Sequence, residues 1–367
     1  MTDYAGLIPV NVITGFLGSG KTTLLQRLLA SPDLSDAAVL INEFGDVGLD
    51  HHLVQPLQEN TVLLASGCLC CTIRGDLTLA LRDLYDRRER GAVPAFRRVL
   101  LETTGLADPA PVAFTLLSDP VIRHHFRLGN LIATVDAVNG RDQLERYPES
   151  VKQAALADRL VLTKTDLATE AQTRELKRQV RRLNAQAPFF DAARETVTPN
   201  DLLLQDLYDP QGRMREISHW LEPGTHDDPA AAGAPHDRSR HDGPSAGLHG
   251  RDIHTFSLVY ERPLDWTAFG IWLTLLLHRH GTQVLRVKGI LNVAGMSTPV
   301  AIHGVQHLVH PPAHLPGWSG DDRRSRIVFI VDGLSRARIE ASLGVFMGLA
   351  EDSVSAAADR GRGAQAT

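Results

Sequence analysis

Short apolar runs recur along the first half of the chain, and helical patterns separate them. Runs of this length, bounded by turn-forming residues, predict buried strands. They are residues 10–13, 37–41, 98–101, 131–135 and 159–163. Apolar residues at helical spacing predict helices in 22–30, 72–88 and 169–184, and Thr169 with Gln172 predicts a capping box. The alternation predicts an α/β fold with a mainly parallel sheet flanked by helices, whose ligands bind at the carboxyl ends of the strands.

The pattern changes near residue 222, so we expect residues 1–221 to form the first domain. Residues 222–252 are rich in Pro, Gly, Ala, Asp and His without an apolar period, which predicts a flexible linker containing histidines. Strand patterns then return in 256–260, 283–293 and 325–333, with helical patterns in 265–281 and 335–349. They predict a smaller α+β domain over 253–350, and the polar residues 351–367 are expected to be disordered.

Composition and charge narrow the class of protein. The chain of 367 residues is 43% hydrophobic and 22% charged, as in soluble globular proteins. Its formal net charge of -5 argues against nucleic-acid or anionic-membrane binding. Because the first residues lack a signal-peptide pattern and no apolar run is long enough to span a bilayer, we expect a cytoplasmic location.

The sequence GFLGSGKT, from Gly15 to Thr22, fits the phosphate-loop pattern G-x-x-x-x-G-K-[ST]. It follows a predicted strand and opens a predicted helix, as a phosphate loop requires. The glycines allow backbone N–H groups to face phosphate oxygens, Lys21 reaches the β- and γ-phosphates, and the Thr22 hydroxyl is placed for Mg²⁺. The predicted nucleotide contacts of this loop are Gly15, Gly18, Ser19, Gly20, Lys21, Thr22 and Thr23.

Two further strand ends carry candidate nucleotide residues. Glu102 ends an apolar strand, which is the Walker B position, and can hold Mg²⁺ or place the attacking water. Gly105 then allows a backbone N–H to approach the γ-phosphate. The strand that ends in TKTD offers Thr163, Lys164 and Asp166. The Asp166 carboxylate can accept two hydrogen bonds from guanine, and adenine has no such donor pair, so GTP is favoured over ATP.

All three cysteines of the chain, Cys68, Cys70 and Cys71, lie within four positions. In a cytoplasmic protein, such clustering favours metal binding or redox chemistry over disulfides. A tetrahedral site could be completed by Glu43 or Asp46, and less readily by the adjacent histidines 51 and 52. The alternatives are buried core cysteines, a redox pair and a purely structural zinc. We favour a labile metal site that is coupled to the nucleotide.

The motifs together resemble the CobW-like metallochaperone GTPases, from about residue 8 to residue 350. The residues that carry the resemblance are GFLGSGKTT, NEFG, GCLCCT, ETTGLADPAP and TKTD, followed by RVKGIL, GVQHLV and RRSRIVFI. The resemblance implies a P-loop GTPase domain, a CobW-like C-terminal domain and delivery of a transition metal in the cytoplasm. Many members carry TKTD in place of the Asn form.

Carried over by position, the resemblance implies a set of residue roles. The expected metal ligands are Glu43, Cys68, Cys70 and Cys71, and the expected catalytic residues are Lys21, Thr22 and Glu102. The sequence GLADPAP is more similar to the zinc-associated members than to the cobalt branch. The implied cofactors are therefore GTP with Mg²⁺ and Zn²⁺, with Co²⁺ as the alternative, and the implied partner is a client metalloprotein.

The mechanism expected from these residues is that Mg²⁺·GTP orders the loops carrying Glu43 and Cys68–Cys71, and that hydrolysis loosens the metal site. Three alternatives stay open: a cobalt-handling GTPase for cobalamin biosynthesis or nitrile hydratase activation, a nucleotide switch with a structural zinc, and an ATP-dependent kinase. The sequence leaves the client, the physiological metal and the oligomeric state open.

Overall fold

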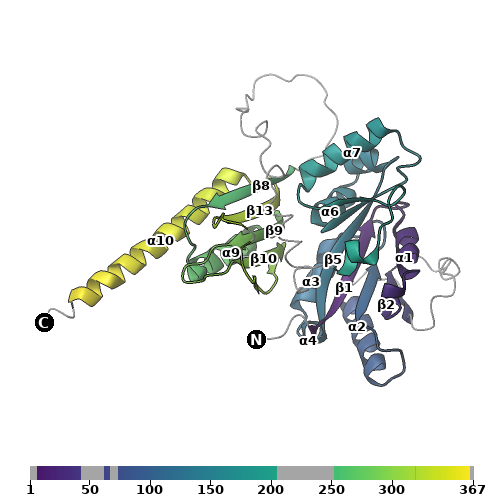
Figure 1. The fold of residues 1–367 in the computed structure, drawn as a ribbon, viewed down its shortest axis with the longest axis horizontal. Helices are drawn as coiled ribbons and strands as arrows, with labels where there is room; N and C mark the ends of the chain where they lie inside the picture. The colour runs from purple at the N-terminus through teal and green to yellow at the C-terminus, as the bar shows by residue number, and fades with distance from the viewer. Residues whose placement is uncertain (1–5, 43–61, 67–72, 205–251, 319, 364–367) are drawn as a thin grey trace. The chain divides into compact units, whose positions relative to one another are not determined.

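The computed structural model describes residues 6–42, 62–66, 73–204, 252–318 and 320–363, with side chains left undescribed at 42, 62–66, 73–76 and 351–363. The chain divides into two compact units, Met1–Gly250 and Arg251–Thr367. Figure 1 shows the helices and strands of each unit. The predicted linker, 222–252, lies almost entirely outside the described residues.

The first unit is built on a seven-stranded sheet whose described pairings are all parallel. Its spatial order is β3-β2-β4-β1-β5-β6-β7. The strands are β1 Ile8–Gly15, β2 Ala37–Asn42, β3 Val62–Ser66, β4 Arg98–Glu102, β5 Phe126–Asp136, β6 Arg159–Thr163 and β7 Phe189–Asp191. The predicted parallel sheet is thus confirmed, and all five predicted strands belong to it. The pattern missed β3 and β7, and it placed the start of β5 too late.

Helices cover both faces of this sheet (Figure 1). They are α1 Lys21–Leu29, α2 Ile73–Glu89, α3 Pro109–Ser118, α4 Ile122–His125, α5 Gly140–Arg146, α6 Pro148–Leu156 and α7 Glu170–Leu183, with a short 3₁₀ helix at Pro32–Leu34 and a short π-helix at Asn200–Leu204. The four leucines of α1 are buried against the sheet, as their spacing predicted. The capping box of Thr169 and Gln172 is present at the start of α7. Helices α3 to α6 were not predicted.

The second unit is a six-stranded antiparallel sheet with two helices. Its elements are β8 Ile253–Tyr260, α9 Trp266–His280, β9 Val284–Leu291, β10 Val300–Val305, β11 Leu308–Val309, β12 Ala313–His314, β13 Ser325–Asp332 and α10 Arg336–Gly363. The predicted α+β class is confirmed. Asp265 caps α9 by accepting a hydrogen bond from the Ala268 N–H. Helix α10 runs to Gly363, past Glu351, where we expected disorder to begin.

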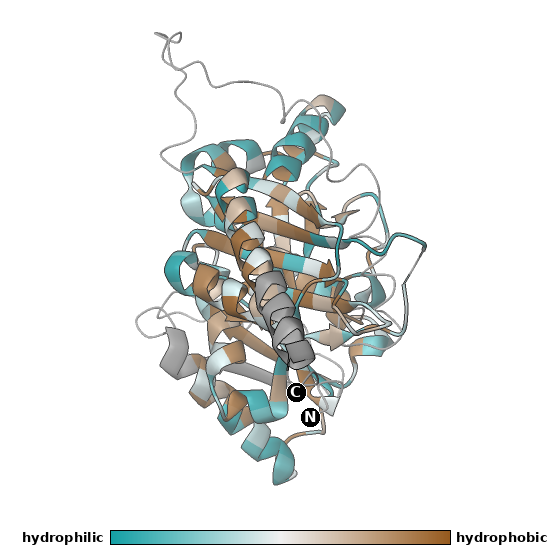
Figure 2. Ribbon diagram, turned by 90° about the vertical axis from the view of Figure 1, so that its left-hand side faces the viewer, coloured by the Kyte–Doolittle hydropathy of each residue, from teal (hydrophilic) through white to brown (hydrophobic). Residues whose placement is uncertain are grey.

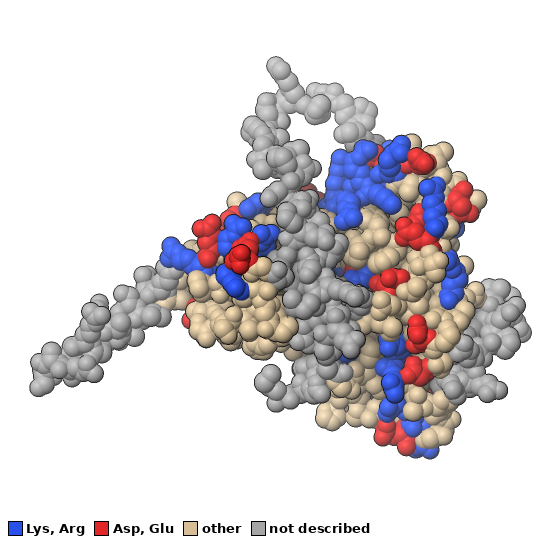
Figure 3. Space-filling model, in the orientation of Figure 1, with Lys and Arg blue, Asp and Glu red and all other residues tan. Residues whose placement is uncertain are grey.

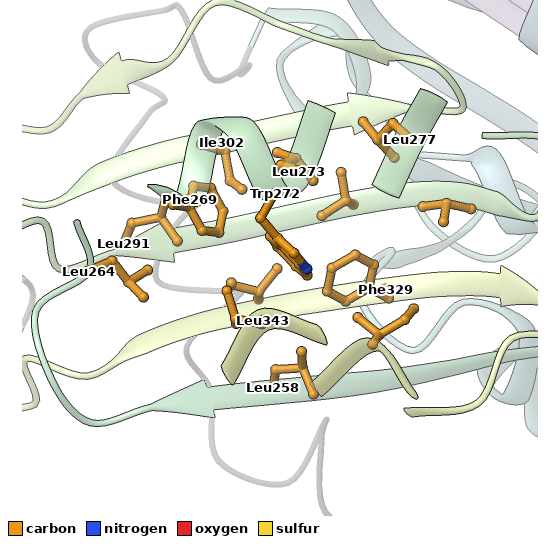
Figure 4. Close-up of a cluster of buried hydrophobic side chains, with 14 of the residues drawn as sticks. Leu258, Leu264, Phe269, Trp272, Leu273, Leu277, Leu291, Ile302, Phe329 and Leu343 are labelled. Atoms are coloured by element: carbon orange, nitrogen blue, oxygen red, sulfur yellow. The ribbon is translucent and has the colours of Figure 1, made fainter. Parts of the chain in front are cut away.

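The core of the second unit lies between α9, α10 and one face of the sheet (Figure 4). Trp272 of α9 and Phe329 of β13 lie at its centre, with ring centroids 6.4 Å apart. The Trp272 indole N–H donates to the Ser342 hydroxyl of α10 at 2.9 Å. This bond satisfies the one polar group that the indole brings into an apolar core.

The distribution of apolar and charged residues agrees with helices that cover buried sheets. Figure 2 shows apolar strands enclosed by helices that carry polar faces. Figure 3 shows Lys and Arg side chains gathered over α7, whose buried positions include Leu176 and Val180, while the Arg174 side chain is exposed. No helix in the described part of the chain is long and apolar enough to cross a membrane.

Candidate nucleotide and metal site

The carboxyl ends of four neighbouring strands meet at one edge of the parallel sheet. In the pairing register, Ile13 of β1 lies beside Glu102 of β4. On the other side of β1, Gly15 lies beside Thr134 of β5. Since strands in a parallel sheet run in one direction, the phosphate loop after β1 opens at the same edge as Glu102. Ligands of open α/β sheets bind at this edge.

The phosphate loop has a backbone that only glycine allows at its first position. Gly15 has a φ of +141°, and a Cβ atom there would lie 2.2 Å from the Thr134 hydroxyl oxygen. The Ser19 hydroxyl shares a hydrogen bond of 2.7 Å with that same hydroxyl. Gly18 and Gly20 also have positive φ angles. The loop is therefore fastened to β5 while its backbone curls over the end of β1.

The three predicted catalytic residues lie close together. The Thr22 hydroxyl donates to a carboxylate oxygen of Glu102 at 2.7 Å. Lys21 and Glu102 are buried, and the Lys21 ammonium donates to the backbone oxygen of Phe16 at 3.1 Å. The hydroxyl and carboxylate oxygens are the hard donors that Mg²⁺ prefers. The residues present thus fit a Mg²⁺ ion beside a nucleoside triphosphate.

The TKTD motif is tied to the phosphate loop by side-chain hydrogen bonds. The Thr163 hydroxyl donates to the backbone oxygen of Ser19 at 2.8 Å. Lys164, with a φ of 56°, donates through its ammonium to the backbone oxygen of Gly18 at 2.8 Å. The same ammonium pairs with the Asp136 carboxylate at 2.7 Å. Thr163 therefore contributes to joining the two loops together with Lys164, although the more familiar motif has Asn at position 163.

Asp136, at the end of β5, is a hydrogen-bond acceptor that holds the Lys164 ammonium. Burial by itself raises the pKa of its carboxyl, but hydrogen bonds outweigh that effect. They come from the Lys164 ammonium, the Asn139 side chain and the backbone N–H groups of Val138 and Asn139. The pKa of Asp136 therefore lies below its ordinary value, and the carboxylate stays charged. An ionised Asp136 holds the Lys164 ammonium against the phosphate loop.

The two remaining nucleotide candidates differ in exposure. Gly105 is buried, and a Cβ atom on it would lie 2.6 Å from the backbone nitrogen of Leu17 in the phosphate loop. Asp166 is exposed, two residues beyond Lys164. The exposed Asp166 carboxylate at this edge is accessible to a nucleobase. Its contact with guanine stays a prediction.

The predicted metal ligands Glu43, Cys68, Cys70 and Cys71 lie outside the described residues, as do the weaker candidates Asp46, His51 and His52. Within the described ranges, no three His, Cys, Asp or Glu side chains form a group that could hold a metal ion. His303 and His310 of the second unit are buried, with parallel rings stacked 4.2 Å apart. Arg286 contacts the Nε2 atom of His303 at 2.8 Å, which agrees with packed histidines and not with ligands.

The sequence patterns missed several residues that shape this edge. Asp136 ends an apolar strand just as Glu102 does, so the same pattern could have identified it. Thr134 and Gln153 carried no signal, since a threonine in a strand and a glutamine in a helix are common. Only the fold brings Thr134 to the phosphate loop and Gln153 to the segment that follows Glu102.

Comparison with known families agrees with this geometry. Residues 9–191 match the model of the CobW/HypB/UreG nucleotide-binding domain, and residues 253–347 match that of the cobalamin synthesis protein CobW C-terminal domain. The chain belongs to the CobW family. The predicted membership of this family and the predicted nucleotide-binding fold are thereby confirmed.

Individual CobW-family relatives cover most of the chain. The zinc chaperone YjiA of Escherichia coli K12 is 33% identical over 336 residues, which is 91% of this chain and 97% of YjiA. The zinc-regulated GTPase metalloprotein activator 1 of Schizosaccharomyces pombe is 28% identical and covers 78% of this chain and 72% of its own length. The crystal structure of Zn(II)-bound YjiA GTPase from E. coli matches with a TM-score of 0.67 at 26% identity, covering 93% and 99% of the two chains.

Proposed function

We propose that this protein is a GTPase that binds zinc at Glu43, Cys68, Cys70 and Cys71 and delivers it to a client metalloprotein in a nucleotide-dependent way. The GTPase activity and the choice of zinc are supported by the names of its relatives, a zinc chaperone and a zinc-regulated GTPase metalloprotein activator. The client class follows from those names, and its identity stays open.

One observation carries the coupling between nucleotide and metal. Asn42 and Ser66 are paired across β2 and β3, so the strands leading into Glu43 and into Cys68 end in register as neighbours. On its other side β2 pairs with β4, where Ile41 lies beside Glu102. In the sequence, Glu43 and Cys68 thus come within two residues of strand ends that lie at the same sheet edge as the nucleotide residues. A triphosphate that orders one segment at this edge would be expected to change the others.

The chemistry of hydrolysis is the in-line attack of water on the γ-phosphate. Lys21 binds the β- and γ-phosphates, and the backbone N–H groups of the phosphate loop stabilise the charge that develops on their oxygens. Mg²⁺, when bound, would be held by Thr22 with Glu102 beside it and would neutralise phosphate charge. Lys164 and Thr163 hold the phosphate loop in place, and Asp166 is the proposed reader of guanine.

The decisive experiment is a competition titration of Zn²⁺ with the protein alone, with GDP and with a non-hydrolysable GTP analogue. We expect the Zn²⁺ affinities with GDP and with the analogue to differ about 10-fold, within the usual range of coupling free energies. By linkage, Zn²⁺ should change the affinity for the analogue relative to GDP by the same factor. Equal zinc affinities in all three conditions would rule out nucleotide-dependent delivery.

The alternatives predict different outcomes in the same set of measurements. Serine at Cys68, Cys70 and Cys71 should remove the nucleotide-sensitive site and leave GTP hydrolysis without zinc unchanged. If the zinc is structural, Cys68→Ala should sharply lower the melting temperature, whereas a delivery site tolerates it. A higher selectivity for Co²⁺ over Zn²⁺ in the GTP state would favour the cobalt-handling alternative.

A further inference from the structure

The segment that follows Glu102, residues 103–108, lies directly against the phosphate loop and its strand. The Thr103 backbone N–H donates to the backbone oxygen of Ile13 at 3.0 Å, and its hydroxyl donates to the Thr14 hydroxyl at 3.0 Å. Gly105 approaches Leu17 so closely that no side chain would fit between them. Whatever fixes residues 105–108 therefore fixes the segment that lies against the phosphate loop.

Two consecutive side chains of α6 hold that segment. The Gln153 side-chain nitrogen donates to the backbone oxygens of Gly105, at 3.1 Å, and Ala107, at 3.0 Å. The neighbouring Lys152 forms an ion pair with Asp108. Asp108 also caps α3 by accepting from the Ala110 N–H at 3.0 Å. Residues 105–108 are thus joined to α6 at three of their four positions.

Helix α6 is itself fixed at both ends. At its carboxyl end, the Asn184 side-chain nitrogen donates to the backbone oxygens of Ala154, at 3.0 Å, and Ala157, at 2.8 Å. At its amino end, the ring of Tyr147 lies 4.5 Å from the ring of Phe16 in the phosphate loop. The helix therefore connects the phosphate loop with residues 105–108 as a rigid support.

The chemistry of Gln153 fits positioning better than general packing. Its side chain is 2% exposed, and two carbonyl oxygens face its nitrogen, which requires the amide NH₂ on that side. The amide oxygen is buried without a hydrogen-bond partner among the described residues. An unsatisfied buried acceptor opposes stability. The side chain thus directs its two donors to one segment while leaving its acceptor unsatisfied.

We propose that Gln153 is a positioning residue for GTP hydrolysis. It holds the backbone of Gly105 and Ala107 where that segment meets the γ-phosphate, and it touches neither the phosphates nor the attacking water. This inference rests on the proposed GTPase function and on the assignment of Gly105 to the γ-phosphate. If the inference is correct, substituting Gln153 lowers kcat and the preference for GTP over GDP, and it leaves the affinity for GDP unchanged.

The test uses two variants of the full-length protein, Gln153→Glu and Gln153→Met. Glutamate keeps the shape but places carboxylate oxygens against two carbonyl oxygens, and methionine keeps the length without any donor. We expect kcat for Mg²⁺·GTP to fall about 10- to 100-fold, because a displacement of about 1 Å in the groups around the reacting atoms can slow a reaction about 100-fold. The affinity for a GTP analogue should fall about 10-fold relative to that for GDP. Lys152→Met should also lower kcat and the affinity for the GTP analogue relative to that for GDP, but by smaller factors.

A matched control is Gln179→Met on α7, since none of the described hydrogen bonds of residues 105–108 involves α7. It should keep the kcat and both affinities of the wild type. Wild-type kcat in both Gln153 variants would overturn the inference, and so would an equal loss of affinity for GDP and the analogue. If the wild type does not hydrolyse GTP, the proposed function fails, and the ratio of the two nucleotide affinities still tests the position of Gln153.

Discussion

The edge of the parallel sheet and the core of the second unit are both buried, but they are filled with different chemistry. At the edge, Glu102, Thr134 and Asp136 are almost fully buried polar groups. In the second unit, Trp272, Phe329 and their neighbours form an apolar core between two helices and a sheet. The difference shows that burial serves two purposes here. Apolar burial drives folding, whereas paired polar burial fixes the position of a loop at some cost in desolvation.

The comparison predicts that stability and nucleotide binding respond to different substitutions. Removing apolar volume from the second core should reduce stability and leave the nucleotide site unchanged. Removing a polar partner at the sheet edge should reduce binding or catalysis with a smaller effect on folding. The predictions below test this separation, beginning with the largest effect.

Phe329→Ala should destabilise the second unit by about 3–5 kcal/mol, because it removes a buried ring and leaves a cavity. Phe329 is fully buried between Phe256, 5.6 Å away, and Trp272. Denaturant unfolding followed by tryptophan fluorescence measures the loss, and calorimetry should give unchanged GDP affinity. Val259→Ala on β8, where the side chain is 41% exposed, serves as the control and should change stability by less than about 0.5 kcal/mol. A loss of nucleotide affinity parallel to the loss of stability would contradict the separation.

Lys21→Met should lower kcat/KM for GTP about 10²- to 10³-fold, equivalent to about 2.7–4 kcal/mol of transition-state stabilisation. The ammonium is the buried charge that the phosphate loop supplies, while the methylene stem and its packing remain in the variant. Steady-state hydrolysis measures the effect, and the melting temperature should change little. Lys177→Met on α7 replaces the same side chain far along the sequence from the loop and should keep the wild-type rate. A Lys21 variant with more than a tenth of wild-type activity would remove this residue from the proposed chemistry.

Asp136→Asn should weaken GTP and GDP binding alike by about 10-fold, close to 1.4 kcal/mol, because Lys164 loses its ion pair beside the phosphate loop. Fluorescence titration with both nucleotides measures the change, and kcat should stay near the wild-type value. Asp83→Asn on α2 removes a carboxylate that is 55% exposed and pairs with Arg87, and it should leave binding unchanged. A selective loss of GTP binding would show that Asp136 acts on the γ-phosphate side instead.

The pH dependence of stability follows from the lowered pKa of Asp136. Because the folded pKa lies below the unfolded value of about 3.9, the stabilisation is fully present above that value. It is lost as the pH falls through the folded pKa. The difference in unfolding free energy between the wild type and Asp136→Asn should therefore shrink below about pH 4. A difference that is constant down to pH 2 would show that the carboxylate is not held in its charged form by folding.

The sequence by itself determined the architecture of both units. Short continuous apolar runs predicted five of the seven strands of the parallel sheet, and the helical period of apolar residues predicted the buried faces of α1 and α7. The phosphate-loop motif and Glu102 were readable because each requires a particular residue type at a strand end. Strands β3 and β7 and helices α3 to α6 escaped the pattern, since short or weakly periodic segments depend on tertiary contacts that a local window does not contain.

Only the tertiary structure decided which contacts hold the residues of the nucleotide site in place. Thr22 meets Glu102 across 80 positions, Ser19 meets Thr134 across 115, and Lys164 meets Gly18 across 146. Gln153 reaches Gly105 from a helix whose sequence carries no motif. Such contacts depend on strand order and register, which bring the carboxyl ends of β1, β4, β5 and β6 to one edge. The residue types set what chemistry is possible there, and the packing of the sheet and α6 sets where each group lies.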